Sequence, residues 1–124
     1  MSYYLAIAAG GALGAMARYW LTNLAEQHNT GVFPVGTLTV NVVGSLLLGA
    51  LFVVTTEKVP AATYLRPLLA VGFLGALTTF STFSMDALLL MQQGFYGTAF
   101  GYILSSVLVC LLAAWAGMSL VNLF

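Results

Sequence analysis

GFLGALTTFSTFSMD, residues 72–86, is a run in which hydroxyl side chains interrupt an otherwise apolar segment. The sequence on both sides of this run is hydrophobic enough to lie in a membrane. In hydrocarbon, polar side chains and broken backbone are tolerated only where they face protein or water. The run therefore predicts a pathway or binding site for something small inside the bilayer.

Composition places the chain among membrane proteins. Of its 124 residues 61% are hydrophobic and 5% are charged, whereas charged residues make up about a quarter of a soluble domain. The formal net charge is zero, and nothing in the sequence favours nucleic acid as a partner. Because a hydrocarbon core takes about 20 apolar residues per helix, we predict an all-α membrane protein with one domain, residues 1–124, and four spans at residues 3–24, 34–56, 66–92 and 97–121.

The orientation of the chain in the membrane is weakly encoded. The positive-inside rule counts Lys and Arg beside the spans, and here Lys58 and Arg66 on one side oppose only Arg18 on the other. Two interpretations follow from so small a bias. One is a fixed topology with both termini in the cytoplasm, and the other is insertion in both orientations, which allows an antiparallel homodimer.

Small residues recur at every fourth position in the first two predicted helices. The first stripe comprises Ala6, Gly10, Gly14 and Arg18, and the second comprises Asn41, Ser45 and Gly49. Such stripes let helix backbones approach closely in a membrane. Packing within one four-helix bundle accounts for either stripe, but 13 glycines in so short a chain also favour an oligomer.

The third predicted span is too long for one straight helix. Residues 66–92 would run about 40 Å at about 1.5 Å per residue, which is more than the bilayer requires. The weak points are Gly72, Gly75 and the pair Thr78-Thr79, so we predict a break there in preference to a simple tilt. A break frees carbonyls that can hold a cation such as Na⁺, and N–H groups that favour an anion.

Two phenylalanines follow the predicted break. Phe80 and Phe83 share a helix face because they are three residues apart. Hydroxyl residues interleave with them, which favours rings that face a polar lumen over rings that face lipid; these are Ser81, Thr82 and Ser84. Aromatic rings have positive edges, which can attract an anion without a formal charge.

Other polar residues form two further sets. Asn41 lies early in the second span, where an amide is costly unless it is paired. Tyr102, Ser106 and Cys110 follow one another at intervals of four in the last span and form a track of weak donors. No pair of a nucleophile with a base and no metal-ligand spacing is present in the sequence, so an enzyme is the least favoured class.

The charged groups near the spans each have two interpretations. Arg18 is the only cation well inside a span, and it either binds an anion or extends to the interface. Asp86 is either an intramembrane functional carboxylate or a solvated group near the end of its span. His28 lies in the first loop and is expected to be solvated.

These motifs resemble the CrcB/Fluc family of fluoride channels. The resemblance is carried by residues 72–84, by Gly36-Thr37-x-x-x-Asn41-x-x-Gly44 and by Gly10-Gly-x-x-Gly14-x-x-x-Arg18. It implies a passive fluoride exporter of the microbial plasma membrane and an antiparallel, dual-topology homodimer with two pores, each lined by both subunits. It also implies a structural Na⁺ at the dimer centre, between the broken third helices.

The resemblance also implies roles for individual residues. The backbone carbonyls of Gly75 and Thr78 would hold the Na⁺. The anion pore would comprise Asn41, Phe80, Ser81, Thr82, Phe83, Ser84, Tyr102 and Ser106, with Arg18 and Asp86 as accessory residues. Three positions depart from the family pattern: Ala76 stands where many relatives have glycine, Asp86 where they often have glutamate, and Cys110 where some have serine.

Two other functions remain open from the residues alone. A small dual-topology multidrug transporter has a similar length, but its proton coupling needs a carboxylate inside the first helix, where this chain has Arg18. A non-transporting membrane assembly subunit accounts for the glycine stripes and leaves the hydroxyl-rich run without a purpose. Composition does not distinguish fluoride from chloride, so that expectation rests on the resemblance.

Overall fold

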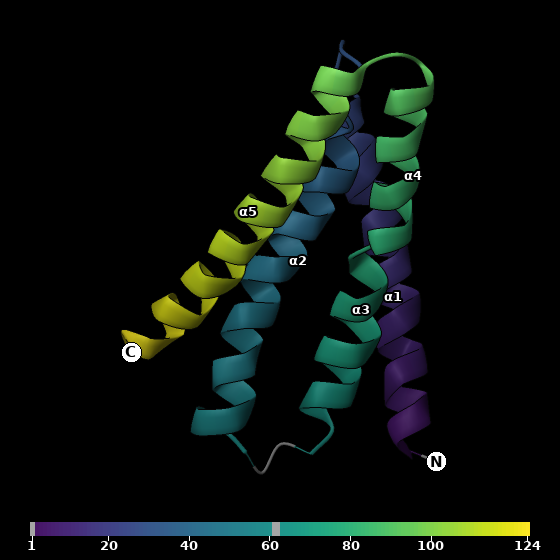
Figure 1. Cartoon of the computed structure of the whole chain (residues 1–124). Coiled ribbons are helices and arrows are strands. Elements are labelled where there is room, and N and C mark those ends of the chain that lie inside the picture. The colour runs from purple at the N-terminus through teal and green to yellow at the C-terminus, as the bar shows by residue number, and fades with distance from the viewer. Residues whose placement is uncertain (1, 61–62) are drawn as a thin grey trace.

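The computed structural model describes residues 2–60 and 63–124, which form four helical stretches joined by short connections. Figure 1 shows them in order along the chain. They are α1 (Ser2–Glu26); α2 (Val35–Val53) with the π-helix η1 (Val54–Lys58); the π-helix η2 (Arg66–Leu74) with α3 (Gly75–Leu77) and α4 (Phe80–Gln92); and α5 (Tyr96–Asn122). The all-helical prediction is confirmed, and each predicted segment falls on one stretch.

Three of the stretches are long and apolar enough to cross a membrane. They are Val35–Lys58, Arg66–Gln92 and Tyr96–Asn122. The remaining one, α1, has 25 residues, which is a sufficient length for a bilayer. It is less apolar than the other three, because it contains Arg18 and several glycines. The helical membrane class is therefore confirmed, and the fourth span at residues 3–24 stays a prediction.

The chain runs back and forth along one direction. In Figure 1 the start of α1, the end of α5, the end of η1 and the start of η2 lie toward one end of the bundle, and the other two connections lie at the opposite end. The turn after α4 depends on Gly94, which has φ of 85°, a left-handed conformation that glycine adopts at little steric cost. This turn brings α5 back beside α2.

Glycines allow close packing in the two most extensively packed helix pairs, α1 with η2 and α2 with α5. A Cβ atom on Gly10 would lie 2.0 Å from the carbonyl oxygen of Leu68, and one on Gly49 would lie 2.1 Å from that of Ala114. Any side chain at these glycines would force the backbones apart. The small-residue stripes are therefore used for packing within the chain.

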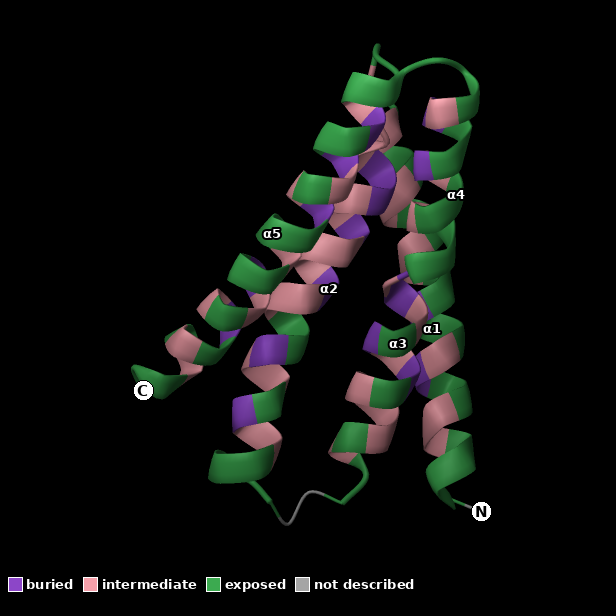
Figure 2. Cartoon of the chain, viewed as in Figure 1, coloured by how far each residue is buried: buried purple, intermediate pink, exposed green. Residues whose placement is uncertain are grey.

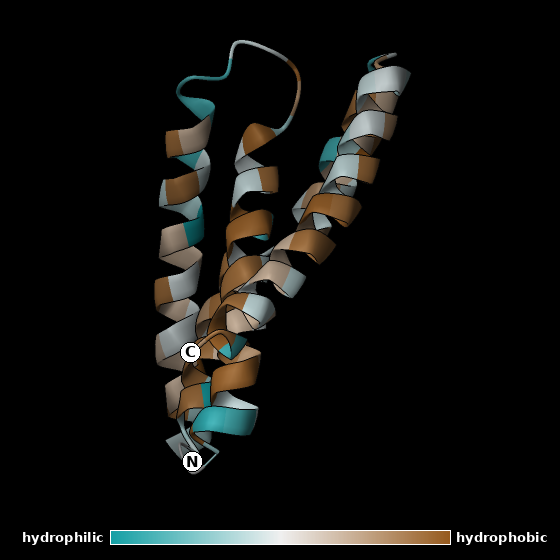
Figure 3. Cartoon of the chain, turned by 90° about the vertical axis from the view of Figure 1, so that its left-hand side faces the viewer, coloured by the Kyte–Doolittle hydropathy of each residue, from teal (hydrophilic) through white to brown (hydrophobic). Residues whose placement is uncertain are grey.

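The buried core is thin, and most of the apolar surface points outward. The largest fully buried side chains are Val40, Val53, Leu77 and Tyr102. Figure 2 shows that buried positions gather where the helices face one another, and Figure 3 shows apolar residues on the outer faces. Exposed large side chains include Tyr4, Leu5, Trp20, Leu111 and Trp115. So much exposed apolar surface fits a molecule surrounded by lipid or by a partner.

Candidate functional site

The third helical stretch is broken at Thr78 and Thr79, as the sequence predicts. Thr78 has ψ of 155°, and Thr79 has φ of −150° and ψ of 112°, so two extended residues separate α3 from α4. Thr78 still donates to the carbonyl of Leu74, with both its N–H (3.0 Å) and its hydroxyl (2.9 Å). The hydroxyl of Thr79 accepts from the N–H of Thr82 at 3.1 Å. It therefore caps the N-terminus of α4.

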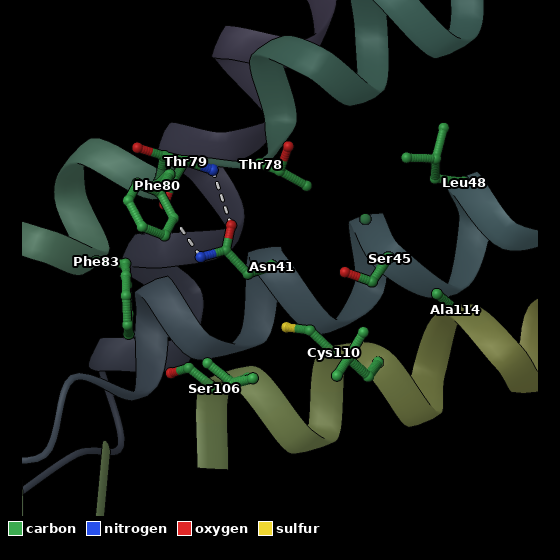
Figure 4. A pocket seen from close by; sticks show the side chains of 13 residues that line it. Asn41, Ser45, Leu48, Thr78, Thr79, Phe80, Phe83, Ser106, Cys110 and Ala114 are labelled. Atoms are coloured by element: carbon green, nitrogen blue, oxygen red, sulfur yellow. Dashed lines mark hydrogen bonds between the residues drawn. The ribbon is translucent and has the colours of Figure 1, made fainter. Parts of the chain in front are cut away.

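Asn41 on α2 bonds to the broken backbone through its side chain. Its Nδ2 group donates to the carbonyl of Thr79 at 3.1 Å, and its Oδ1 atom accepts from the N–H of Thr79 at 2.8 Å (Figure 4). In a continuous helix, that N–H would instead bond to the carbonyl of Gly75. The costly amide predicted at Asn41 is thus paired, and the carbonyl of Gly75 loses its helical donor.

A cleft of about 450 Å³ opens beside the break. Figure 4 shows that α2 and α5 form one side of it, and that the segment from Thr78 to Phe83 forms the other. Its lining residues are Asn41, Gly44, Ser45, Leu48, Thr78, Thr79, Phe80, Phe83, Ser106, Val107, Cys110, Leu111 and Ala114. None of the described residues that line it is charged, so its polarity comes from an amide, hydroxyls and a thiol.

The hydroxyl of Ser106 is the least satisfied polar group in this cleft. Ser106 is only 7% exposed, and its Oγ atom has no hydrogen-bond partner among residues 2–60 and 63–124. A buried hydroxyl without a partner is costly, so a group that supplies one would be favoured here. Cys110, which is half-buried, follows one turn later in the same lining.

The two phenylalanines both line the cleft but differ in burial. Phe80 is 79% exposed. Phe83 is half-buried, and its ring lies between the rings of Phe80 and Tyr102, at centroid distances of 5.4 Å and 5.3 Å. The structure therefore brings the predicted rings together with Asn41 and Ser106.

Three predicted hydroxyl residues do not line the cleft. Ser81 and Thr82 are exposed and bond to the hydroxyl of Thr79, at 3.2 Å and 3.0 Å. Ser84 is also exposed and donates to the carbonyl of Phe80 at 2.9 Å. These residues lie at the start of α4, and their hydroxyls bond to that helix and to its N-cap residue. The structure thus separates them from the residues that face α2 and α5.

Tyr102 also lies outside the cleft lining, because its side chain is fully buried. Its hydroxyl donates to Oδ2 of Asp86 at 3.2 Å, and the hydroxyl of Thr37 donates to the same oxygen at 2.7 Å. Asp86 is therefore half-buried and tied to α2 and α5. Both interpretations of Asp86, a functional carboxylate and a solvated group near the end of its span, stay predictions. The polar track divides, since Ser106 and Cys110 face the cleft and Tyr102 faces Asp86.

The predicted cation ligands and the remaining charged residues lie around this centre. Thr78 lines the cleft, and Gly75 is exposed on the helix just before the break. Arg18 is half-buried and forms no ion pair or hydrogen bond with the part of the chain that the structure describes. His28 is exposed in the first connection, as expected.

Two residues of the site were not singled out as site residues by sequence reasoning. Ser45 lines the cleft one turn after Asn41, and its place in the small-residue stripe was a signal for this. Thr37 holds Asp86. Its partner is far away in the sequence, so no local pattern points to the pair.

Comparison with known proteins identifies the family. The family model described as "CrcB-like protein, Camphor Resistance (CrcB)" matches residues 5–118. The chain belongs to the CrcB family. Every candidate residue discussed above lies inside the matched range, so the CrcB match covers the break, the cleft and the residues around Asp86.

Curated relatives in the CrcB family are similar over nearly their whole length. The chain is 50% identical over 121 residues to the "Fluoride-specific ion channel FluC" of Hahella chejuensis, which covers 94% of this chain and 92% of that protein. It is 49% identical over 112 residues to the protein of the same name from Magnetococcus marinus, covering 90% and 91%. These relatives are named ion channels, so the predicted CrcB resemblance and the prediction of a non-enzyme are confirmed.

Proposed function

We propose that this chain is a fluoride-selective channel of the cell (inner) membrane, which lets fluoride leave passively and so lowers its cytoplasmic concentration. The observation that carries the proposal is the cleft beside the helix break. It combines neutral hydrogen-bond donors with two phenylalanine rings, and no charged group lies among the described residues that line it. The choice of fluoride rests on the names of the relatives.

The chemistry of the cleft suits a small anion that must enter and leave quickly. Fluoride gives up a strong hydration shell and needs other donors in its place. The unpaired hydroxyl of Ser106, the hydroxyl of Ser45 and the free N–H of Asn41 can supply them, and the rings of Phe80 and Phe83 offer positive edges. Because these donors are neutral, they bind weakly enough to allow rapid release.

The channel proposed here is an antiparallel, dual-topology homodimer in which the partner subunit completes each pore. One chain presents the break on its surface, and Phe80 is 79% exposed beside a cleft that is open on one side. An isologous contact about a two-fold axis would cover both breaks at once. The weak charge bias of the loops allows both orientations.

A structural Na⁺ at the dimer centre is part of the same proposal. Neutral carbonyl oxygens suit a monovalent cation better than Ca²⁺ or Mg²⁺. The carbonyl of Gly75 has lost its helical donor, because the N–H of Thr79 bonds to Asn41 instead. The space beside Gly75 is open: of the described residues, an added Cβ atom would meet only the carbonyl oxygen of Ala70, at 3.6 Å. The carbonyls of Gly75 and Thr78 would hold the ion.

The sodium proposal has its own test. Replacing Na⁺ with N-methylglucamine during purification should lower the thermal stability of the dimer, and no sodium flux should accompany fluoride flux. An unchanged melting temperature without sodium would contradict the site.

Fluoride efflux from liposomes that contain only the purified protein tests the channel. A fluoride electrode should record rapid efflux once the membrane potential is relieved, and a chloride electrode in parallel vesicles should record none. Protein-free vesicles and vesicles with an unrelated helical membrane protein are the controls. The absence of fluoride efflux would favour a non-transporting subunit and refute the proposal.

A further inference from the structure

Asn41 has a side chain whose hydrogen bonds can be fully accounted for. A primary amide offers two N–H donors and one carbonyl acceptor. One N–H donates to the carbonyl of Thr79 at 3.1 Å, and the amide oxygen accepts from the N–H of the same residue at 2.8 Å. The second N–H has no acceptor among the residues that the structure describes, and Asn41 lines the cleft.

Thr79 depends on this pairing more than any other residue of the break. It is 7% exposed, and its extended backbone takes its N–H out of helical pairing, while its carbonyl, as that of the N-cap residue, begins the hydrogen bonds of α4 and also accepts from Asn41. Buried backbone groups without partners are costly. Thr78 keeps its helical donor bond to Leu74, and the side chain of Thr79 is used to cap α4. Among the described residues of the break, only Thr79 has a backbone that bonds to a side chain from another helix.

The position of Phe80 follows from that of Thr79, because the two residues are adjacent and Phe80 begins α4. α2 holds the break at a second point as well. A Cβ atom on Gly44, almost one turn after Asn41, would lie 2.2 Å from Cγ2 of Thr78. The missing side chain at Gly44 makes room for Thr78, and Asn41 binds the residue after it.

We propose that Asn41 is a positioning residue, which fixes the break and thereby Phe80 through the backbone of Thr79. The part of this inference that concerns flux rests on the proposed channel function. The part that concerns the break is independent of what the protein transports.

The substitution Asn41→Asp turns this inference into a pH-dependent test. A neutral carboxyl has an acceptor and an O–H donor, like the amide, whereas a carboxylate has acceptors only. The variant can therefore pair with both backbone groups of Thr79 only when it is neutral, a form that burial favours. Because burial raises the pKa of a carboxyl above its ordinary value of about 3.9, we expect native geometry toward about pH 5 and a displaced Thr79 toward about pH 8.

The elements that pack on α2, and α2 with its extension η1, carry other titratable groups. Cys110 of α5 lines the same cleft, and Tyr102 of α5 bonds to Asp86 of α4, which in turn bonds to Thr37 one turn before Asn41. Glu26 of α1 accepts from the N–H of Gly36 at 2.7 Å. The remaining charged residues are Arg18 of α1, Arg66 at the exposed start of η2, and Glu57 and Lys58 of η1. All of these are present in the wild type, so its own pH profile accounts for them.

Two readouts separate the inference from the proposed function. The ¹⁵N chemical shift of the Thr79 amide, recorded in nanodiscs, should move in Asn41→Asp at about pH 8 and return at about pH 5. Fluoride efflux should fall about tenfold at the higher pH and recover at the lower one, since losing one buried hydrogen bond costs about one decade. Wild-type protein at both pH values corrects for leak of the neutral acid.

Asn23→Asp is the matched control, because Asn23 is exposed on α1. It should change neither readout. A native Thr79 amide shift both in Asn41→Asp at the two pH values and in Asn41→Ser would overturn the inference, and so would a displaced amide with undiminished efflux. If the wild type shows no efflux, the channel proposal fails while the amide shift still tests the break. If Asn41→Asp does not fold, Asn41→Ser must show a displaced Thr79 amide at every pH.

Discussion

At the scale of single residues, side chains of one type have different surroundings in the structure. Phe80 is largely exposed, whereas Phe83 is packed between two other rings. Ser119 donates back to the carbonyl of Trp115 at 2.9 Å, and Ser106 donates to none of the described residues. The neighbours of a residue, more than its type, therefore determine whether its loss affects flux or stability.

The two phenylalanines should respond differently to replacement by alanine. Both Phe80→Ala and Phe83→Ala should sharply reduce fluoride flux, because each removes a ring that lines the cleft. Only Phe83→Ala should also destabilise the fold, by about 2 kcal/mol, since it leaves a gap beside Tyr102. Efflux assays and thermal melts of the purified variants measure the two effects.

Phe100→Ala is the control for both variants, because Phe100 is 64% exposed on α5 and does not line the cleft. It should keep wild-type flux and stability. Wild-type flux in Phe80→Ala and Phe83→Ala would contradict the assignment of the pore.

Removing the Ser106 hydroxyl should reduce fluoride flux and leave the stability of the fold almost unchanged. Ser106→Ala deletes a group without a partner in the described structure, so the free energy of unfolding should change by no more than about 0.5 kcal/mol. Fluoride flux should fall about tenfold, because an ion that loses its shell loses one replacement donor. Ser119→Ala is the matched control with flux unchanged. A marked loss of stability in Ser106→Ala, with normal flux, would show that the hydroxyl is structural.

At the scale of elements, the break could be predicted from the sequence, whereas the hydrogen bonds that hold it could not. Length and the placement of Gly72, Gly75 and the Thr78-Thr79 pair predict a break in the third stretch, because these are local properties of the chain, and the structure places it at the pair. The bonds that hold the break come from Asn41 on another helix. Long-range pairs of this kind have no signature in local sequence. The same holds for the pairing of Asp86 with Thr37 and Tyr102.

Gly44 provides a prediction at this scale. In Gly44→Ala the new methyl group would meet Cγ2 of Thr78 at 2.2 Å, so either α2 or the break must shift. We expect a loss of stability of about 1–3 kcal/mol, the usual cost of overpacking, and reduced fluoride flux. Gly97→Ala, where an added Cβ meets no described atom within 4 Å, is the control and should fold normally. Unchanged flux and stability in Gly44→Ala would mean that the break is not held by α2.

At the scale of the whole molecule, the composition established the membrane class, and the glycines were open to two uses. The sequence left packing within the chain and packing between chains as alternatives. The structure shows the first, at Gly10, Gly14, Gly49 and Gly117, where side chains would collide with carbonyls of the neighbouring helix. Single-chain packing does not reveal a partner, so the dimer stays a prediction and needs its own experiment.

Thiol labelling from each side of the membrane tests the dual topology. Thr30 lies exposed in the connection between α1 and α2, and Thr30→Cys in a Cys110→Ser background places one thiol there. An impermeant reagent should label part of the population from each side of intact cells or inverted vesicles. Labelling of all copies from one side only would contradict dual insertion and the antiparallel dimer.

The reversal potential of the current in planar bilayers shows whether the protein is a passive channel for fluoride. With a fluoride gradient and symmetrical chloride and pH, we predict a protein-dependent current that reverses at the Nernst potential for fluoride, about 59 mV for a tenfold gradient at 25 °C. A coupled transporter would reverse elsewhere, at a potential that depends on the second ion. Reversal near zero, or no current from protein that is folded and inserted, would rule out a fluoride channel.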